Sequence, residues 1–168
     1  MFRQRRRNDS AAAEYRRSAG AIIVSRDGGS CLLVKQKEGQ QWSLPKGSCQ
    51  SFESFEKCME REVAEETGIR LSEHRHFVLT SGRQKWKRYV IFVVKLLDPH
   101  DSVGLKILDE QEIDDIQWVD IRTVFRMRLN RVTKDCLRRY LIDCTTTRGG
   151  ERRRADYQHF GHKNCRRG

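Results

Sequence analysis

The hydrophobic and polar positions along the chain alternate in short blocks that predict strands and helices in mixed order. Apolar stretches at 18–24 and 30–35 flank the turn residues 26–29, which predicts a β-hairpin. Three later apolar runs predict further strands, at 76–80, 87–97 and 113–119. The run at 87–97 is rich in β-branched and aromatic residues, which favour strands. The pattern therefore indicates a fold with both strands and helices.

Two segments have helical character. Residues 53–67 contain no Gly or Pro, and Gly68 follows them where a helix commonly ends in the left-handed conformation. Apolar residues recur at helical spacing over 121–142. Between the hairpin and the first helix, Pro45 and Gly47 predict a loop.

Length and charge suggest one domain between two basic arms. A chain of 168 residues suits a single core, and its net charge of +11 is concentrated toward the ends. The first seventeen residues hold six arginines against two acidic residues, a balance of +4. We expect a basic arm at 1–14, one domain at 15–145 and a basic tail at 146–168. Such arms raise affinity for nucleic acid in a salt-dependent way, unless they are only solvated tails.

Cysteine usage and hydropathy bear on the compartment. The six cysteines accompany neither a secretory leader nor paired motif spacing, so we expect reduced thiols and no disulfide framework. No apolar run approaches the roughly 18 residues of a membrane span. We expect an intracellular protein in the cytoplasm, with the nucleus or, through the arginine-rich start, the mitochondrion as alternatives. The sequence does not define the oligomeric state.

Three carboxylates share one side of the first predicted helix. At about 100° per residue, Glu62, Glu65 and Glu66 fall within an arc of about 100°. Like charges at this spacing repel one another unless a cation lies between them. Clustered carboxylate oxygens suit Mg²⁺ or Mn²⁺ rather than zinc, while a solvated acidic face is the alternative reading.

A wider pattern surrounds these carboxylates. Gly47 is followed by five residues, Glu53, seven residues and then 61–69, Arg-Glu-Val-Ala-Glu-Glu-Thr-Gly-Ile. This stretch resembles the Nudix box at every fixed position. The resemblance implies a Nudix-type α/β/α sandwich with a mixed β-sheet, which is an α/β fold. It also implies a magnesium- or manganese-dependent hydrolase that cleaves a diphosphate (acid anhydride) bond.

The resemblance also implies roles for individual residues. Glu62 and Glu66 would be metal ligands, Glu65 a ligand or the base that activates water, and the backbone carbonyl of Lys46 a further ligand. A glutamate beyond the box often joins the site in this family, and Glu110 and Glu112 are the candidates. We prefer Glu112 as ligand or base, because 112–118 resembles the Glu-Ile-x-x-Ile-x-Trp stretch of mRNA-decapping members.

Physical reasoning gives three box residues structural roles. Gly47 permits a tight loop, Gly68 ends the helix, and Glu53 can pair with Arg61 to hold the loop on the helix.

The substrate is less tightly defined than the chemistry. Segment 42–47, Trp-Ser-Leu-Pro-Lys-Gly, resembles decapping and diadenosine polyphosphate hydrolases, whereas 83–89 resembles the basic strand of diphosphoinositol polyphosphate enzymes. We assign substrate binding to four basic residues, Lys46, Arg83, Lys85 and Arg88. The basic arms favour capped or 5′-triphosphorylated RNA. The alternatives are a diadenosine or diphosphoinositol polyphosphate and, without catalysis, an RNA-binding Nudix module.

Overall fold

The computed structural model describes residues 16–71, 74–84, 87–95 and 105–147. The described strands are β1 (Arg16–Val24), β2 (Ser30–Gln36), β3 (Trp42–Ser43), β4 (Lys46–Ser48), β5 (His76–Gln84), β6 (Lys87–Lys95) and β7 (Ile113–Asp120). The described α-helices are α1 (Phe55–Thr67) and α2 (Arg131–Thr147), and short 3₁₀ turns occupy Glu38–Gln40 and Val124–Arg126. The expected arm at 1–14, Lys85 and residues 148–168 of the expected tail lie outside the described residues, whereas Thr146 and Thr147 of that tail belong to α2.

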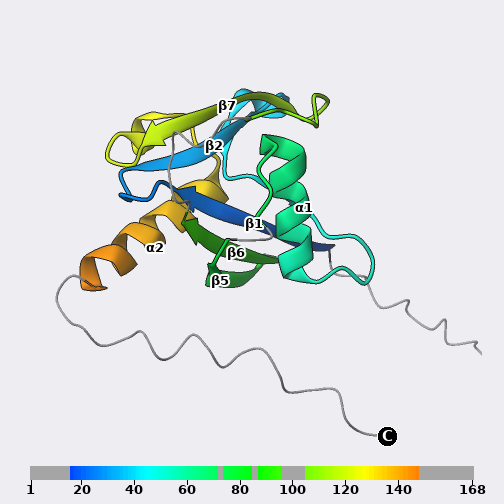
Figure 1. Ribbon diagram of the computed structural model, residues 1–168, viewed down its shortest axis with the longest axis horizontal. Coiled ribbons are helices and arrows are strands. Elements are labelled where there is room, and N and C mark those ends of the chain that lie inside the picture. The colour runs from blue at the N-terminus through cyan, green and yellow to red at the C-terminus, as the bar shows by residue number, and fades with distance from the viewer. Residues whose placement is uncertain (1–15, 72–73, 85–86, 96–104, 148–168) are drawn as a thin grey trace, which may run out of the picture.

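The strands form one mixed sheet in the order β3-β2-β1-β6-β5, with β4 paired to β1 and β7 paired to β2. β1 and β6 run parallel over nine residue pairs, whereas the other pairings are antiparallel. The expected hairpin of β1 and β2 is present, and the two strands pair in register at Val24↔Cys31. Beyond that pair β1 follows β6 and β2 follows β7, so the two strands diverge (Figure 1).

The two helices cover opposite faces of the sheet, and β1, β6 and β5 lie between them (Figure 1). A hydrophobic core lies on each face of the sheet, and alternate residues of β1 contribute to each. Ala21 and Ile23 pack in the core that α1 covers, and Ile22 packs in the core that α2 covers. Burial on both faces explains why this strand is continuously apolar in the sequence. The expected α/β/α sandwich with a mixed sheet is confirmed.

Two predictions of local structure, the start of the second helix and the loop before the first, are wrong. The second helix does not begin at 121, because α2 starts at Arg131 after a 3₁₀ turn and an extended connection. The side chain of Asn130 accepts a hydrogen bond from the Thr133 amide at 2.8 Å and donates one to Ser43 Oγ at 2.9 Å. This cap fixes the start of the helix against β3.

The expected loop at Pro45 and Gly47 is also wrong. Lys46–Ser48 forms strand β4, and Gly47 pairs with Ala19 of β1. A Cβ at Gly47 would overlap the carboxylate of Glu62. Glycine leaves room here for the Glu62 carboxylate, and a larger residue would have to displace the end of that side chain.

Candidate active site

Helix α1 is limited at both ends by local sequence. Ser54 accepts a hydrogen bond from the Lys57 amide at 3.1 Å and so caps the first turn. Gly68 adopts a left-handed conformation with φ of 77°, and its amide donates to the carbonyl of Ala64 at 2.9 Å. The expected helix end at Gly68 is confirmed. The helix buries Cys58, Met59 and Val63 against the sheet, which sets the direction of its glutamates.

Arg61 joins the loop before α1 to the carboxylates on it. Its Nε and Nη2 atoms each lie 3.0 Å from an oxygen of Glu53, and Nη2 also donates to the carbonyl of Ser48 at 2.9 Å. Its Nη1 atom lies 2.9 Å from Glu62 and from Glu65. The expected Glu53–Arg61 pair is therefore present. The hydrogen bond from Arg61 lowers the pKa of Glu53 and raises that of Arg61.

Glu66 is the buried carboxylate of the group, with 3% of its surface exposed. It accepts a hydrogen bond from the backbone amide of Lys46 at 2.9 Å, which ties the helix to β4. Burial raises the pKa of Glu66 to about 8, and the charges of Glu62 and Glu112 add to this rise. The Lys46 amide and ammonium act in the opposite direction.

Glu62 is half-buried beside the backbone of Gly47. Burial raises its pKa, the charges of Glu65 and Glu112 add to the rise, and Arg61 opposes it. Glu65 differs from its neighbours, because its side chain is 45% exposed and is held by Arg61. The expected shared face thus divides into an inner pair, Glu62 and Glu66, and an outer glutamate.

Hydrogen bonds hold the turn that carries Glu112 on the end of α1. The amides of Leu108 and Asp109 donate to the carbonyl of Glu65 at 2.9 and 3.0 Å, which docks the turn on the end of α1. The Asp109 carboxylate accepts from the amides of Gln111 and Glu112 at 3.1 and 3.2 Å. Sequence reasoning missed Asp109, although an Asp two and three residues before its amide partners is a recurring turn signal.

Glu110 and Glu112, the two glutamates that the sequence left open, are both exposed. The charge of Glu112 raises the pKa of Glu62 and of Glu66. The carbonyl of Glu110 accepts a hydrogen bond from Lys37 Nζ. The preference for Glu112 as ligand or base stays a prediction.

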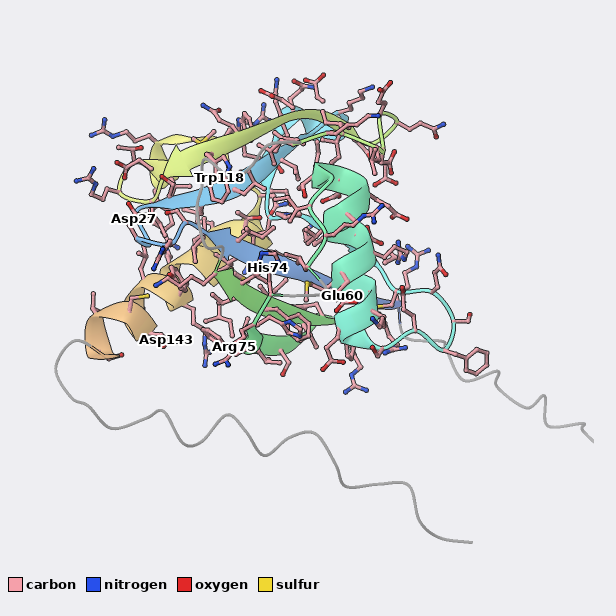
Figure 2. The ribbon with its side chains drawn as sticks, in the orientation of Figure 1. Asp27, Glu60, His74, Arg75, Trp118 and Asp143 are labelled. Carbon is pink, nitrogen blue, oxygen red and sulfur yellow. The ribbon has the colours of Figure 1, made fainter. Side chains whose placement is uncertain are left out.

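The opposite face of the sheet carries an open cleft. One part, of about 280 Å³, is lined by Lys46, Tyr89, Arg131 and neighbouring residues. Tyr89 and Arg131 also line an adjoining part of about 640 Å³, which continues along α2. In Figure 2, Asp143 marks the α2 end of this cleft, well away from Glu60 on α1. Sequence reasoning missed Tyr89 and Arg131, because nothing local shows that β6 meets the start of α2.

The four basic residues assigned to substrate lie at different places. Lys46 lines the cleft, and its strand also places Gly47 beside Glu62. Arg88 pairs in register with Arg17, whose guanidinium lies 4.5 Å from the ring centre of Phe55 on α1. Side chains in register share one face, so Arg88 points to the α1 side and not into the cleft. Arg83 lies opposite Arg88 on β5, and Lys85 lies outside the described residues.

The carboxylate group fits a hard divalent cation. Glu62 and Glu66 are partly or wholly withdrawn from water, and a third carboxylate, Glu112, adds its charge to theirs. Ionised carboxylates that are buried near one another repel, so a nearby positive charge stabilises them. Their oxygen donors suit magnesium or manganese. Glu62 and Glu66 stand at the box positions whose resemblance implied metal binding, and Glu112 lies beyond the box.

Comparison with known proteins identifies the family. The sequence model of the NUDIX domain matches residues 14–140, well over half of the chain. The chain therefore belongs to the Nudix family, and it is a hydrolase of pyrophosphate bonds from a family that generally uses divalent metal ions.

Individual relatives are similar at modest identity. An RNA pyrophosphohydrolase of Ruthia magnifica subsp. Calyptogena magnifica is 27% identical over 126 residues, covering 63% of this chain and 68% of that protein. The mRNA-decapping enzyme subunit 2 of Arabidopsis thaliana is 35% identical over 105 residues, covering 59% of this chain and 26% of that protein. The chain thus matches about a quarter of the plant protein.

A solved structure shows the same fold. An Ap4A hydrolase of C. elegans, in a binary complex, superposes with a TM-score of 0.60 at 20% identity, covering 78% of this chain and 98% of that chain. Identity at this level supports the fold alone.

Proposed function

We propose that this Nudix hydrolase uses Mg²⁺ to cleave a diphosphate linkage at the 5′ end of RNA, at a cap or a 5′-triphosphate. The carrying observation is the position of two glutamates against β4: Glu66 accepts the Lys46 amide at 2.9 Å and Glu62 lies beside Gly47, next to the lysine that lines the cleft. Two relatives, an RNA pyrophosphohydrolase and an mRNA-decapping subunit, support an RNA substrate.

In this proposal Glu62 and Glu66, with the carbonyl of Lys46, hold the cation. The cation, when bound, neutralises the diphosphate and lowers the pKa of a water molecule. Glu66 is kept in position by the Lys46 amide, and Glu62 by Arg61 and the space above Gly47. Burial raises the free energy of the ionised carboxylates, and a bound cation would offset that cost. The carboxylates would therefore exchange their protons for a cation.

The proton of the attacking water goes to a carboxylate of the chain. Glu65 is engaged by Arg61 at 2.9 Å, whereas Glu112 lies on a separate turn and its charge raises the pKa of Glu62 and of Glu66. We therefore assign general base catalysis to Glu112 and the holding of Arg61 to Glu65. Lys46 would bind the phosphates from the cleft side, with its charge near Glu66.

The inner part of the cleft offers a surface for the group beyond the phosphates. Tyr89 presents an aromatic side chain and Arg131 a guanidinium beside Lys46. An aromatic ring and a planar cation can both stack on a nucleobase, and this favours a nucleotide end over an inositol ring.

The test is product identification from a panel of substrates with Mg²⁺ present. Purified full-length chain is incubated with cap-labelled RNA, 5′-triphosphorylated RNA, diadenosine polyphosphate and diphosphoinositol polyphosphate. Release of a nucleoside diphosphate from the cap, or of pyrophosphate from the triphosphate, is expected. Selective cleavage of either small molecule would retain the Nudix chemistry and refute the RNA substrate.

A matched pair of variants links the product to the site. Glu66→Gln keeps the shape and the acceptor for the Lys46 amide but removes the charge, and we expect a loss of about 10³-fold in kcat. Glu56→Gln changes an exposed glutamate in the first turn of the same helix and should leave the rate unchanged. Near-normal turnover in Glu66→Gln would contradict the assignment.

A further inference from the structure

Two thiols and a carboxylate gather where the loop before α1 meets its first turn. The Sγ atoms of Cys49 and Cys58 and a carboxylate oxygen of Glu53 all lie within 4.8 Å of one another. The comparisons assign nothing to this group, and the spacing of the cysteines gave no sign of it. We propose that Cys49, Glu53 and Cys58 bind a zinc ion at a site separate from the Glu62–Glu66–Glu112 group.

The separations are close to those that zinc requires. Zinc binds thiolate sulfur at about 2.3 Å and carboxylate oxygen at about 2.0–2.2 Å in a tetrahedron, so its ligand atoms lie about 3.4–3.8 Å apart. Because the three ligand atoms lie within 4.8 Å of one another, the side chains need to close by at most about 1 Å. The carbonyl oxygen of Gly47, 3.9 Å from Cys58 Sγ, or a water molecule can take the fourth position.

The donor chemistry separates this site from the carboxylate group. Two sulfurs and one oxygen suit a soft or borderline cation, whereas Mg²⁺ binds oxygen donors. Cys58 is buried and Cys49 and Glu53 are half-buried, so the ion would be shielded without being inaccessible. The two cations should therefore not exchange places.

The charges around the site balance. Two thiolates and Glu53 carry three negative charges, zinc carries two positive charges, and Arg61, already paired to Glu53, carries the third. On binding, both thiol protons pass to solvent and two Zn–S bonds form, with no change of oxidation state. A zinc ion placed here is thus electrically compensated by residues that are already in position.

The backbone holds the ligands before any metal is bound. The amide of Cys49 donates to the carbonyl of Arg17 in β1 at 2.9 Å, and Cys58 belongs to α1. The Glu53 carboxylate accepts hydrogen bonds from the Gln50 amide at 2.8 Å and from Nε and Nη2 of Arg61. Zinc would therefore join β1, the loop and the catalytic helix, and it should stabilise the fold without entering the reaction.

Cobalt(II) titration of the whole chain tests the site. The reduced, chelator-treated protein is titrated with Co²⁺ in excess Mg²⁺, which keeps the carboxylate group supplied with its own cation. We expect one equivalent of Co²⁺ to give thiolate-to-metal charge-transfer absorption with the strong visible bands of a tetrahedral site, and Zn²⁺ to abolish both. Zn²⁺ should also raise the thermal midpoint.

Variants identify the ligands. Cys49→Ser, and independently Cys58→Ala, should lose the charge-transfer absorption while circular dichroism reports a retained fold. Cys144→Ser changes an exposed cysteine on α2 and is the matched control, which should bind as the unaltered chain does. Absence of charge-transfer absorption in the unaltered chain, or its persistence in both test variants, would overturn the proposal. Neither result depends on the substrate proposed above.

Discussion

The two faces of the sheet are organised in different ways. On the α1 face, Arg61 alone connects Ser48, Glu53, Glu62 and Glu65, all within the 23-residue box. On the α2 face, the cleft is assembled from β6 and α2, whose lining residues Tyr89 and Arg131 are far apart in sequence. The comparison suggests that the α1 face determines the chemistry, while the α2 face determines which phosphate compound is accepted.

The α1 face should respond most strongly to pH when no cation is bound. Burial raises the pKa of folded Glu66 to about 8, whereas in the unfolded chain the carboxyl has its ordinary pKa of 4.5. The native state therefore binds more protons between these values, and the free energy of unfolding falls as pH rises from about 5 to 8. The Glu66 contribution should be on the order of 3 kcal/mol.

Denaturant unfolding in chelator at pH 5 and at pH 8 measures this loss. Glu66→Gln should flatten the profile, leaving the smaller slope due to Glu62, whose pKa is also raised. Saturating Mg²⁺ should restore stability at pH 8 in the unaltered chain and much less in the variant. An identical pH slope in both proteins would refute the buried-carboxylate account.

The second prediction separates the two glutamates of the turn that docks on α1. Glu112→Gln should lower kcat by about 10²-fold, because a general base is removed while the turn remains bonded through Asp109. Glu110→Gln should change kcat by less than about threefold. Single-turnover kinetics with saturating substrate measure both, and equal effects of the two changes would contradict the assignment to Glu112.

The third prediction concerns Asp109, which holds Glu112 and touches no phosphate in our proposal. Asp109→Ala removes the acceptor for the Gln111 and Glu112 amides and should lower kcat by about tenfold. Asp109→Asn retains an acceptor oxygen and should recover most of the rate. Failure of Asn to rescue, with the fold intact, would show that the carboxylate charge itself is needed.

The smallest effect is expected on the α2 face. Arg131→Gln should raise KM about fivefold with little change in kcat, because the residue lines the cleft and not the carboxylate group. Arg126→Gln, an exposed arginine in the turn before α2, is the control. A fall in kcat that matches the rise in KM would mean that the two faces are not separable in function.

Elements with strong local signals were predictable from the sequence. The strand cores at 18–24, 30–35 and 113–119, the helix ending at Gly68 and the Glu53–Arg61 pair are all present. The start of α2 was not, because apolar spacing continues through 121–130 while the backbone there bonds to β3 instead. The Asn130 cap depends on Ser43, which is 87 residues away.

The reason for Gly47 shows the same limit. The sequence suggested that Gly47 permits a tight loop, but in the structure it leaves room for the Glu62 carboxylate against β4. Arg88 was assigned to substrate binding together with Lys46, and strand register places it on the α1 side of the sheet, away from the cleft that Lys46 lines. Within the residues that the structure describes, no helix combines the length and apolarity needed to cross a membrane.

By itself the sequence determined the family, the α/β class and the helix that carries Glu62, Glu65 and Glu66, because these depend on spacing within one helix and its flanking loop. Tertiary structure decided the rest. It placed Glu66 against the Lys46 amide, opened the cleft beside Lys46, and brought Cys49 and Cys58 together with Glu53. Side chains from separate elements come into contact only through the sheet register and the packing of the helices. No local pattern in the sequence shows which distant residues become neighbours in this way.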